Sequence, residues 1–253
     1  MYAAERRQWI VDRVRANGRA EVASLASELE VTPETIRRDL SALEDAGLLR
    51  RAHGGAIPVE RLRFEQELSS RDVLLADEKE AIAKKALALV PAGGSVLIDA
   101  GSTTARLARL LAPDEELTVV TNSMPIALEL GMRENCQLHC IGGRIRAKTM
   151  AAVDSWAIRA LGEVNVDVAF IGTNGINLAR GLSTADAAEA AVKRAMIASA
   201  EMVVVLADHS KWGEQKFASF ASLGDVDVII TDSGAPADLV AEVESAGPKV
   251  VIA

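Results

Sequence analysis

The sequence predicts an α/β protein with an N-terminal winged helix-turn-helix domain and a C-terminal domain built on a mostly parallel sheet. Within the first sixty residues, short amphipathic stretches precede two basic, strand-like segments around a Gly-Gly turn. From residue 77 onward, strand and helix signals alternate, which predicts a sheet covered by helices. We therefore assign residues 1–57 to the first domain, 58–76 to a linker and 77–253 to the second domain.

The composition places the chain among ordinary globular proteins. Its 253 residues are 49% hydrophobic, enough for real cores, yet no run approaches eighteen consecutive apolar residues. The N-terminus MYAAERRQWI lacks the charged, apolar and small-residue order of a secretory signal. We therefore expect a cytoplasmic protein that makes no contact with a membrane.

The cysteines lie in the segment CQLHC, which we predict to be a strand. Cys136 and Cys140 would share one face of that strand, and His139 would lie on the other. Two thiols without a second pair of ligands are a weak signal for zinc. We expect buried, reduced core cysteines, no metal site and no cofactor.

Three helices are predicted in the first domain. Apolar residues within 10–14 form one stripe, and those within 22–29 repeat at i, i+3, i+4 and i+7. A third helix begins where Thr32 offers a capping hydroxyl and Pro33 takes the first helical position. It ends at Gly47, because glycine is the usual stop residue of a helix.

The third helix has an apolar side, formed by Ile36, Leu40 and Leu43, and a polar side. The polar side projects away from the core, and a helix N-terminus with arginines suits the major groove of DNA. A solvated face with Arg-Asp pairs is the alternative. The candidate DNA-binding residues on this helix are Thr32, Glu34, Thr35, Arg37, Arg38 and Ser41.

The wing is predicted in LLRRAHGGAIPV, where two short strands flank a Gly-Gly turn. Charge supports a nucleic-acid partner: residues 1–63 carry 11 Arg, no Lys and 10 acidic residues, a net charge of +1 in a chain of net charge −8. An Arg-rich genomic composition is the alternative, but it does not explain the clustering. The candidate wing residues are Arg50, Arg51, His53, Gly54 and Gly55.

The segment TIRRDLSALEDAGLLRRAHGGA resembles the signature of the DeoR family of bacterial sugar-metabolism repressors, and the likeness extends over essentially the whole chain. The resemblance implies that the winged helix binds operator DNA. It places Thr35, Arg37 and Arg38 at the groove and Arg51 and His53, with the two glycines that follow, in the wing.

In the second domain, seven segments read as strands: residues 95–100, 117–122, 137–143, 166–172, 201–208, 227–232 and 249–253. Ligands of such sheets bind beyond the carboxyl ends of the strands. Small polar residues follow several strands, and DAGSTTA opens a helix whose N-H groups suit a phosphate. Each could be a simple turn or cap. The candidate effector-binding residues here are Asp99, Gly101, Ser102, Thr103, Thr104, Thr121, Asn122, Gly142, Gly143, Arg144, Gly172 and Asn174.

The segment LSTADAAEAAVKRAM places Asp186, Glu189 and Lys193 on one helix face, where they could bind sugar hydroxyls and a phosphate. A solvated Glu189-Lys193 pair is the alternative. Lys211, in DHSKWG, is a candidate second cation, and a plain surface lysine is its alternative.

The second domain resembles the DeoR effector domain, whose fold is similar to ribose 5-phosphate isomerase and coenzyme A transferases. Such isomerases carry an Asp-Gly-Ala-Asp motif after a VDVA-like strand, and here residues 171–174 read Ile-Gly-Thr-Asn. Both acids are replaced by groups that cannot accept a proton near neutral pH. We therefore expect ligand binding without turnover. An isomerase with an accessory nucleic-acid domain, and a scaffold that uses the winged helix for protein contacts, are the rival hypotheses.

Within the family, the N-terminus and the run AAVDSWAIRALGEVNVDVAFIGTNGINLARGLSTAD look most like actinobacterial regulators of fructose uptake. This resemblance implies a repressor whose effector is fructose 1-phosphate. Because one small winged helix rarely makes enough contacts, we also expect a homodimer or homotetramer that presents two of them to operator DNA.

Overall fold

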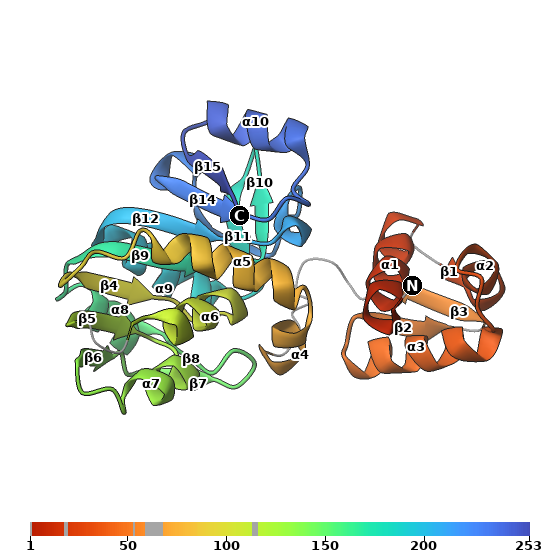
Figure 1. The fold of residues 1–253 in the computed structure, drawn as a ribbon, viewed down its shortest axis with the longest axis horizontal. Coiled ribbons are helices and arrows are strands. Elements are labelled where there is room, and N and C mark those ends of the chain that lie inside the picture. The colour runs from red at the N-terminus through yellow and green to blue at the C-terminus, as the bar shows by residue number, and fades with distance from the viewer. Residues whose placement is uncertain (1, 18–19, 53, 59–67, 113–115) are drawn as a thin grey trace. The chain divides into compact units, whose positions relative to one another are not determined.

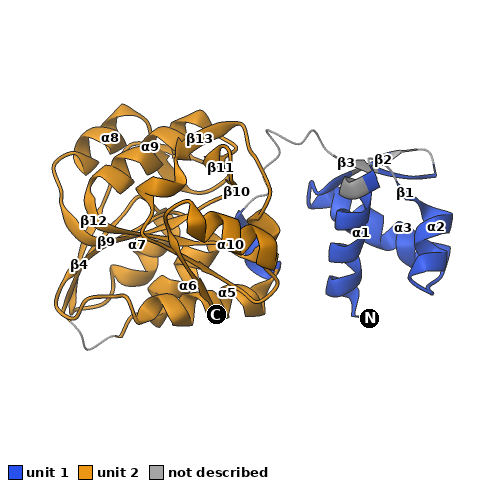
Figure 2. Ribbon diagram, turned by 90° about the horizontal axis from the view of Figure 1, so that it is seen from above, with its two compact units in different colours: residues 1–74 blue, residues 75–253 orange. Residues whose placement is uncertain are grey.

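The computed structural model describes residues 2–17, 20–52, 54–58, 68–112 and 116–253. These residues form two compact units, divided between residues 74 and 75 (Figure 2). Among the described residues, no helix has the length and apolarity needed to cross a membrane.

The first unit is a winged helix-turn-helix, as predicted (Figure 1). Its elements are α1 (Ala3–Asn17), β1 (Ala20–Glu21), α2 (Val22–Glu28), α3 (Pro33–Asp45), β2 (Leu49–Ala52), β3 (Gly55–Pro58) and α4 (Leu68–Val73). The strands pair antiparallel in the order β1-β3-β2. The two-residue strand β1 was not predicted, because so short a segment carries no periodicity. Ile10, Leu25, Ile36 and Leu40 are fully buried in one core.

Both ends of α3 follow the sequence prediction. The Thr32 hydroxyl accepts a hydrogen bond from the Thr35 N-H at 3.2 Å, and Pro33 opens the helix. Gly47 has φ +65°, and the Leu48 N-H donates to the Leu43 carbonyl at 2.8 Å. This pattern satisfies the last carbonyls and ends the helix where glycine was expected.

The second unit is built on a seven-stranded sheet in the order β15-β14-β12-β9-β4-β5-β6, and every pair in it is parallel. Its strands are β4 (Ser95–Ile98), β5 (Leu117–Thr121), β6 (Cys136–Cys140), β9 (Val166–Gly172), β12 (Ala200–Leu206), β14 (Val228–Thr231) and β15 (Lys249–Ile252). These are the seven predicted strands, so the predicted parallel sheet is confirmed.

Helices cover both faces of this sheet (Figure 1). One face packs against α5 (Ala76–Leu87), α6 (Ser102–Leu110) and α7 (Met124–Leu130). The other packs against α8 (Ser155–Leu161), α9 (Ala187–Ala198) and α10 (Ala237–Ser245). The alternation of strand side chains divides the core accordingly: Val96 and Ile98 face the first group, and Leu97 faces the second.

Two smaller sheets were not predicted. The hairpin of β7 (Arg144–Arg146) and β8 (Ala151–Val153) is antiparallel, as is the sheet of β10 (Gly175–Asn177), β11 (Gly181–Thr184) and β13 (Ala218–Ala221). The short 3-10 helices η1 (His209–Lys211) and η2 (Leu223–Asp225) complete the unit. These strands have three or four residues each, and β8 and β11 are buried at every position, so no alternation marks them.

The prediction of buried core cysteines was wrong. Cys140 is exposed and Cys136 is half-buried, because β6 is an edge strand of the large sheet. The pattern within one strand does not reveal whether a neighbour covers both of its sides. The predicted linker contains α4, and its residues 59–67 lie outside the described part of the chain.

Candidate functional site

The polar face of α3 presents its arginines to solvent. Arg37 and Arg38 are exposed, and Arg37 Nη1 lies 3.1 Å from an oxygen of the exposed Glu34. The alternative of a solvated face with Arg-Asp pairs is met only in part, because the acidic partner of Arg37 is Glu34 and Asp39 pairs with Arg6 and Arg7. Exposed pairs such as that of Arg37 and Glu34 contribute about 0–1 kcal/mol, so the guanidinium is easily transferred to another acceptor.

The wing is tied to α3 through Arg51. Arg51 Nη1 donates to the Ser41 hydroxyl at 3.1 Å, and its backbone N-H donates to Glu44 Oε1 at 2.9 Å. Gly54 has φ +75°, and a Cβ at Gly55 would lie 2.1 Å from the Ala20 carbonyl oxygen. The two glycines therefore shape the wing against β1. His53 and the side chain of Arg50 lie outside the described part of the chain.

In the second unit, three predicted residues meet where the central strands end. Lys193 of α9 donates to Asp99, which follows β4, and to the Gly172 carbonyl at 2.8 Å. The Gly172 N-H also donates to Asp99 Oδ2, at 3.0 Å. Both charged side chains are less than a tenth exposed, so this is a buried ion pair joining β4, β9 and α9.

Burial dominates the electrostatics of Asp99. It raises the pKa of Asp99 above the ordinary value, although the Lys193 ammonium and the Gly172 N-H oppose that change. The negative charge of Glu189 raises the pKa further, which shows that the second carboxylate acts on the first. The charge of Asp99 therefore depends on the Lys193 ammonium beside it.

Glu189 lies in a second polar cluster. Its Oε1 accepts hydrogen bonds from Thr149 Oγ1 at 2.5 Å and Arg146 Nη1 at 3.2 Å. Its Oε2 lies 3.2 Å from Thr184 Oγ1, which in turn lies 2.9 Å from Asn174 Oδ1. The alternative of a solvated Glu189-Lys193 pair is wrong, because both side chains are buried and bonded to other residues.

Asp186 caps α9 and completes this cluster. It accepts hydrogen bonds from the N-H groups of Ala188 and Glu189 at 2.9 and 3.1 Å, and it lies 3.2 Å from Arg146 Nε. Desolvation would raise the pKa of Asp186, but the backbone N-H groups and the Arg146 charge outweigh it and lower that pKa. Arg146 therefore bridges two carboxylates.

Sequence reasoning missed Arg146, Thr149 and Thr184. The first two lie in the β7–β8 hairpin, 43 and 40 positions before Glu189 in the chain. A weak signal existed in the alternating arginines of GGRIR, but nothing in one sequence pairs them with α9. Thr184 ends β11, one of the short strands that carry no periodicity.

The N-terminus of α6 borders Asp99 in the chain. Gly101 is its N-cap, and Ser102, Thr103 and Thr104 are buried in the first turn. The Thr104 hydroxyl donates to the Gly101 carbonyl at 3.0 Å. Among the described residues, no hydrogen bond is found for the side chains of Ser102 or Thr103. Two hydroxyls and the first N-H groups of α6 thus lie together at this end of the sheet.

Thr121 and Asn122 stabilise the same edge from β5. Thr121 Oγ1 donates to the Ile98 carbonyl at 2.6 Å, and Asn122 Oδ1 accepts from the Ala100 N-H at 3.1 Å. Asn122 also donates to the Ala152 carbonyl of β8 at 3.2 Å. These two side chains hold the loop after β4 in place, which is a positioning role rather than an exposed binding surface.

Other predicted residues lie elsewhere. Arg144 is exposed, with its Nε 3.7 Å from Asp154, and Gly142 and Gly143 form the turn that leads into β7. Lys211 donates to Ser210 at 2.9 Å and lies 3.7 Å from Asp208, in η1 after β12. A contribution of these residues to ligand binding stays a prediction.

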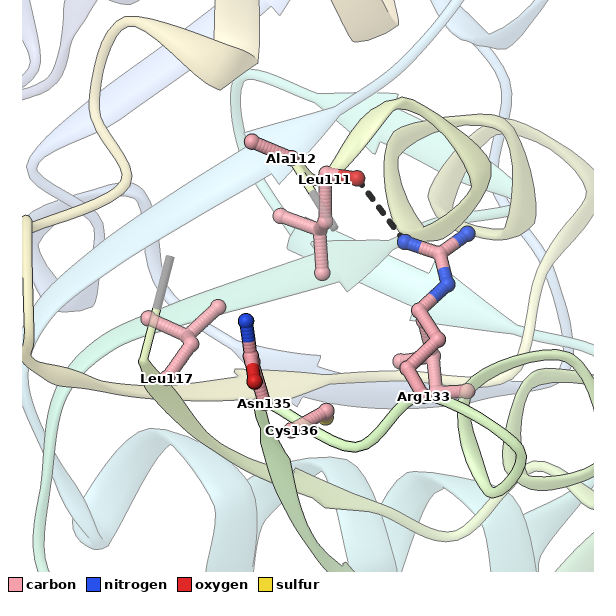
Figure 3. Close-up of a pocket in the computed structure, with 7 residues that line it drawn as sticks. Leu111, Ala112, Leu117, Arg133, Asn135 and Cys136 are labelled. Atoms are coloured by element: carbon pink, nitrogen blue, oxygen red, sulfur yellow. Dashed lines mark hydrogen bonds between the residues drawn. The ribbon is translucent and has the colours of Figure 1, made fainter. Parts of the chain in front are cut away.

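A small, mainly apolar pocket lies at the opposite end of β5 and β6 (Figure 3). Leu117 and Cys136 begin these strands, whereas the predicted site follows their carboxyl ends. Arg133, its one charged lining residue, donates to the Leu111 carbonyl at 2.8 Å. This pocket is therefore separate from the cluster around Asp99 and Glu189.

His209 titrates beside Asp232, and this pair gives a testable expectation. Its hydrogen bond to Asp232, 2.7 Å from Nδ1 to Oδ2, raises the pKa of His209 above 6.5 despite partial burial. The pair therefore stabilises the fold fully below the unfolded pKa of histidine and loses its effect as pH rises through the folded pKa. In an NMR titration, Asp232→Asn should lower the pKa of His209, and its stability deficit should be larger at pH 6 than at pH 9. An unchanged pKa would contradict this assignment.

The residues that replace the isomerase acids have structural roles. Ile171 is fully buried in the core, and Asn174 lies against Thr184. The carboxylates nearby, Asp99 and Glu189, are bonded to Lys193 and Arg146. Each of these two carboxylates therefore has a cation of the same unit as its partner.

Comparisons with known proteins identify the family. Residues 6–61 match the DeoR-like helix-turn-helix domain, and residues 75–233 match the DeoR C terminal sensor domain. The HTH-type transcriptional regulator GlpR of Haloferax volcanii is 40% identical, covering 99% of this chain and 98% of that protein. The transcriptional repressor AccR of Agrobacterium fabrum is 35% identical, covering 91% of this chain and 90% of that protein.

Among solved structures, ribose 5-phosphate isomerase A of Methanocaldococcus jannaschii is similar over 54% of each chain, with 22% identity and a TM-score of 0.41. The two domain matches lie one in each compact unit and, with the full-length relatives, account for almost the entire sequence. The chain therefore belongs to the DeoR family of helix-turn-helix transcriptional regulators.

Proposed function

We propose that the chain is a repressor of sugar uptake or metabolism genes whose affinity for operator DNA changes when a phosphorylated sugar binds the second unit. Fructose 1-phosphate is the first candidate effector. The protein would act in the cytoplasm as a homo-oligomer, since two winged helices together provide enough contacts for a specific site.

The observation that carries the proposal is the set of charges where the sheet's central strands end. The buried Lys193-Asp99 pair lies directly before the first turn of α6, where N-H groups and the Ser102 and Thr103 hydroxyls collect. Backbone N-H groups at a helix N-terminus favour a phosphate. The carboxylates of Asp186 and Glu189, held by Arg146, are suited to accept hydrogen bonds from sugar hydroxyls.

The same arrangement supports a response to the ligand. Arg146 and Thr149 come from the β7–β8 hairpin and contact Glu189 of α9. A sugar hydroxyl that bonds Glu189 competes with these two donors. Because a ligand shifts an equilibrium only through unequal affinity for two states, such competition supplies the difference that regulation needs. The choice of fructose 1-phosphate rests on the likeness of residues 151–186 to actinobacterial regulators of fructose uptake.

Thermal unfolding tests the effector site. At 100 times its dissociation constant, a ligand that binds the folded state alone stabilises it by about 2.7 kcal/mol. We therefore expect fructose 1-phosphate to raise the Tm of the second unit by roughly 5–10 °C, and free fructose to leave it unchanged. Glucose 6-phosphate and ribose 5-phosphate serve as specificity controls.

Thr103→Ala should reduce this shift in Tm, because it removes a hydroxyl from the first turn of α6 while leaving the helix intact. Thr118→Ala is the matched control, since Thr118 lies at the start of β5, away from the site. A Tm indifferent to every sugar phosphate, or an equal shift in both variants and the parent chain, would show that the site is wrongly placed.

A further inference from the structure

A buried carboxylate ties the recognition helix to α1. Asp39 lies on α3 with its side chain 3% exposed, and it accepts hydrogen bonds from two consecutive arginines of α1. Arg6 Nε donates to Asp39 Oδ2 at 2.5 Å, and Arg7 Nε donates to Asp39 Oδ1 at 2.8 Å. Each carboxylate oxygen therefore holds one guanidinium through its Nε atom.

The position of Asp39 on α3 places these arginines beside the polar face. Asp39 comes four residues after Thr35 and one after Arg38, so it lies where the polar face meets the buried face. On the other side of the polar face, Ser41 holds Arg51 of the wing. Arginines therefore flank the exposed face of α3 on both sides, and each flank is anchored to α3 by a side chain of that helix.

We propose that Arg7, held by Asp39 and supported by Arg6, is a phosphate-binding residue that contacts the DNA backbone beside the groove occupied by α3. The proposal rests on α3 being the recognition helix. Asp39 is a positioning residue in this arrangement, because it acts through Arg7 and makes no contact with DNA.

The geometry of the guanidinium supports this role. Asp39 uses the Nε atoms, so neither hydrogen bond occupies the outer edge formed by Nη1 and Nη2. That edge is the planar fork that matches two phosphate oxygens. The Arg7 side chain is 39% exposed, whereas that of Arg6 is 13% exposed, so Arg7 is the one offered to a ligand.

The charge balance points the same way. One carboxylate neutralises one of the two guanidiniums and leaves a positive charge at the surface beside α3. Fixing the guanidinium before DNA arrives also lowers the side-chain entropy lost on binding, which improves affinity.

The test measures DNA affinity of the full-length chain by fluorescence anisotropy. Two probes are used: a 30-base-pair duplex selected by the parent chain from a random library, and a duplex of unrelated sequence. Arg7→Gln should weaken binding to both probes by a similar factor, about tenfold. The slope of log Kobs against log[salt] should become shallower by about 0.9 for the lost phosphate contact.

Arg13→Gln is the matched control, because it removes the same charge from the same helix. Arg13 bonds Glu28 at 3.0 Å and lies over the Trp9 ring, away from Asp39. Its affinity should stay within twofold of that of the parent chain, and its salt slope should not change. Equal effects of Arg7→Gln and Arg13→Gln would overturn the proposal, since general charge would then explain both.

Asp39→Asn separates positioning from bulk electrostatics. It removes a negative charge near DNA, so long-range electrostatics alone predicts tighter binding. Loss of the anchor instead predicts weaker binding, while each phosphate contact that remains contributes to the salt slope as it does in the parent chain. A thermal melt followed by circular dichroism confirms that the variant is folded at the assay temperature. If Asp39→Asn does not fold, Arg7→Lys is tested in its place. Lysine keeps the charge but cannot bond Asp39 and a phosphate with one planar group. DNA affinity equal to that of the parent chain, in either variant, overturns the proposal. Failure of the parent chain to select any duplex would instead refute the DNA-binding function itself.

Discussion

Replacing Lys193 with alanine is expected to lower the free energy of unfolding of the second unit by about 3–5 kcal/mol, the usual cost of leaving one partner of a buried ion pair uncompensated. Asp99 is 2% exposed and would lose its ammonium partner, keeping the Gly172 N-H. Urea unfolding followed by circular dichroism at pH 7 measures the loss. The double variant Asp99→Asn/Lys193→Met should recover much of it, because no buried charge then stays unpaired.

The stability deficit of the Lys193→Ala variant should change with pH in a defined direction. The Lys193 charge opposes the effect of burial, so its removal raises the pKa of Asp99 further. The folded state then binds a proton more tightly than the unfolded state does. Its stability therefore increases as pH falls, and the deficit should be smaller at pH 5 than at pH 8. Lys84→Ala, which removes an exposed lysine paired with Glu80, is the control. Equal deficits in Lys193→Ala and Lys84→Ala would show that the buried pair is not formed.

The double substitution Arg37→Ala/Arg38→Ala should abolish specific operator binding while the winged unit stays folded. Both side chains are exposed, so their removal leaves no cavity. Each arginine that bonds a base edge contributes roughly 1–3 kcal/mol of discrimination, so a double loss exceeds a hundredfold in affinity at the middle of that range.

The comparison of specific and unrelated duplexes tells base contacts from phosphate contacts. If either arginine contacts only phosphate, its single variant weakens both duplexes equally. Parent-like affinity of the double variant, with Arg13→Gln as the charge control, would contradict the assignment of α3 as the recognition helix.

The long helices and the strands of the large sheet were predictable because the apolar pattern of each segment matches the burial of its residues in the fold. Strands β9 and β12 each contain an apolar run, residues 168–171 and 202–206, as expected of strands that are covered on both faces of the sheet. The β7–β8 hairpin was not predictable in the same way. Its strands have three residues each, and its position over the sheet edge depends on contacts such as Arg146 to Glu189, which are far apart in the chain.

The site was predicted in part for a topological reason. Residues at the carboxyl ends of parallel strands gather at one edge of the sheet, so Asp99 and Gly172 could be predicted to lie at the same edge. Their direct contact follows from the pairing of β4 with β9, which the sequence did not predict. Burial of charge was harder to predict. Lys193, Glu189 and Asp39 were assigned to polar helix faces or left unassigned, because periodicity treats every charge as solvated and does not reveal a partner on another element.

The order of strands in the large sheet also bears on how the chain folds during synthesis. The strands of the winged unit have all been synthesised by residue 58. In the large sheet, β4 can pair with β9 only after residues 166–172 have been synthesised, and Ser95 accordingly bonds Asp167, 72 positions later in the chain. Domains fold as they emerge from the ribosome, and long-range parallel pairing is slow. A nascent chain therefore completes its DNA-reading unit well before its sensor. Chains truncated before β9 should keep a folded winged helix that no effector can regulate.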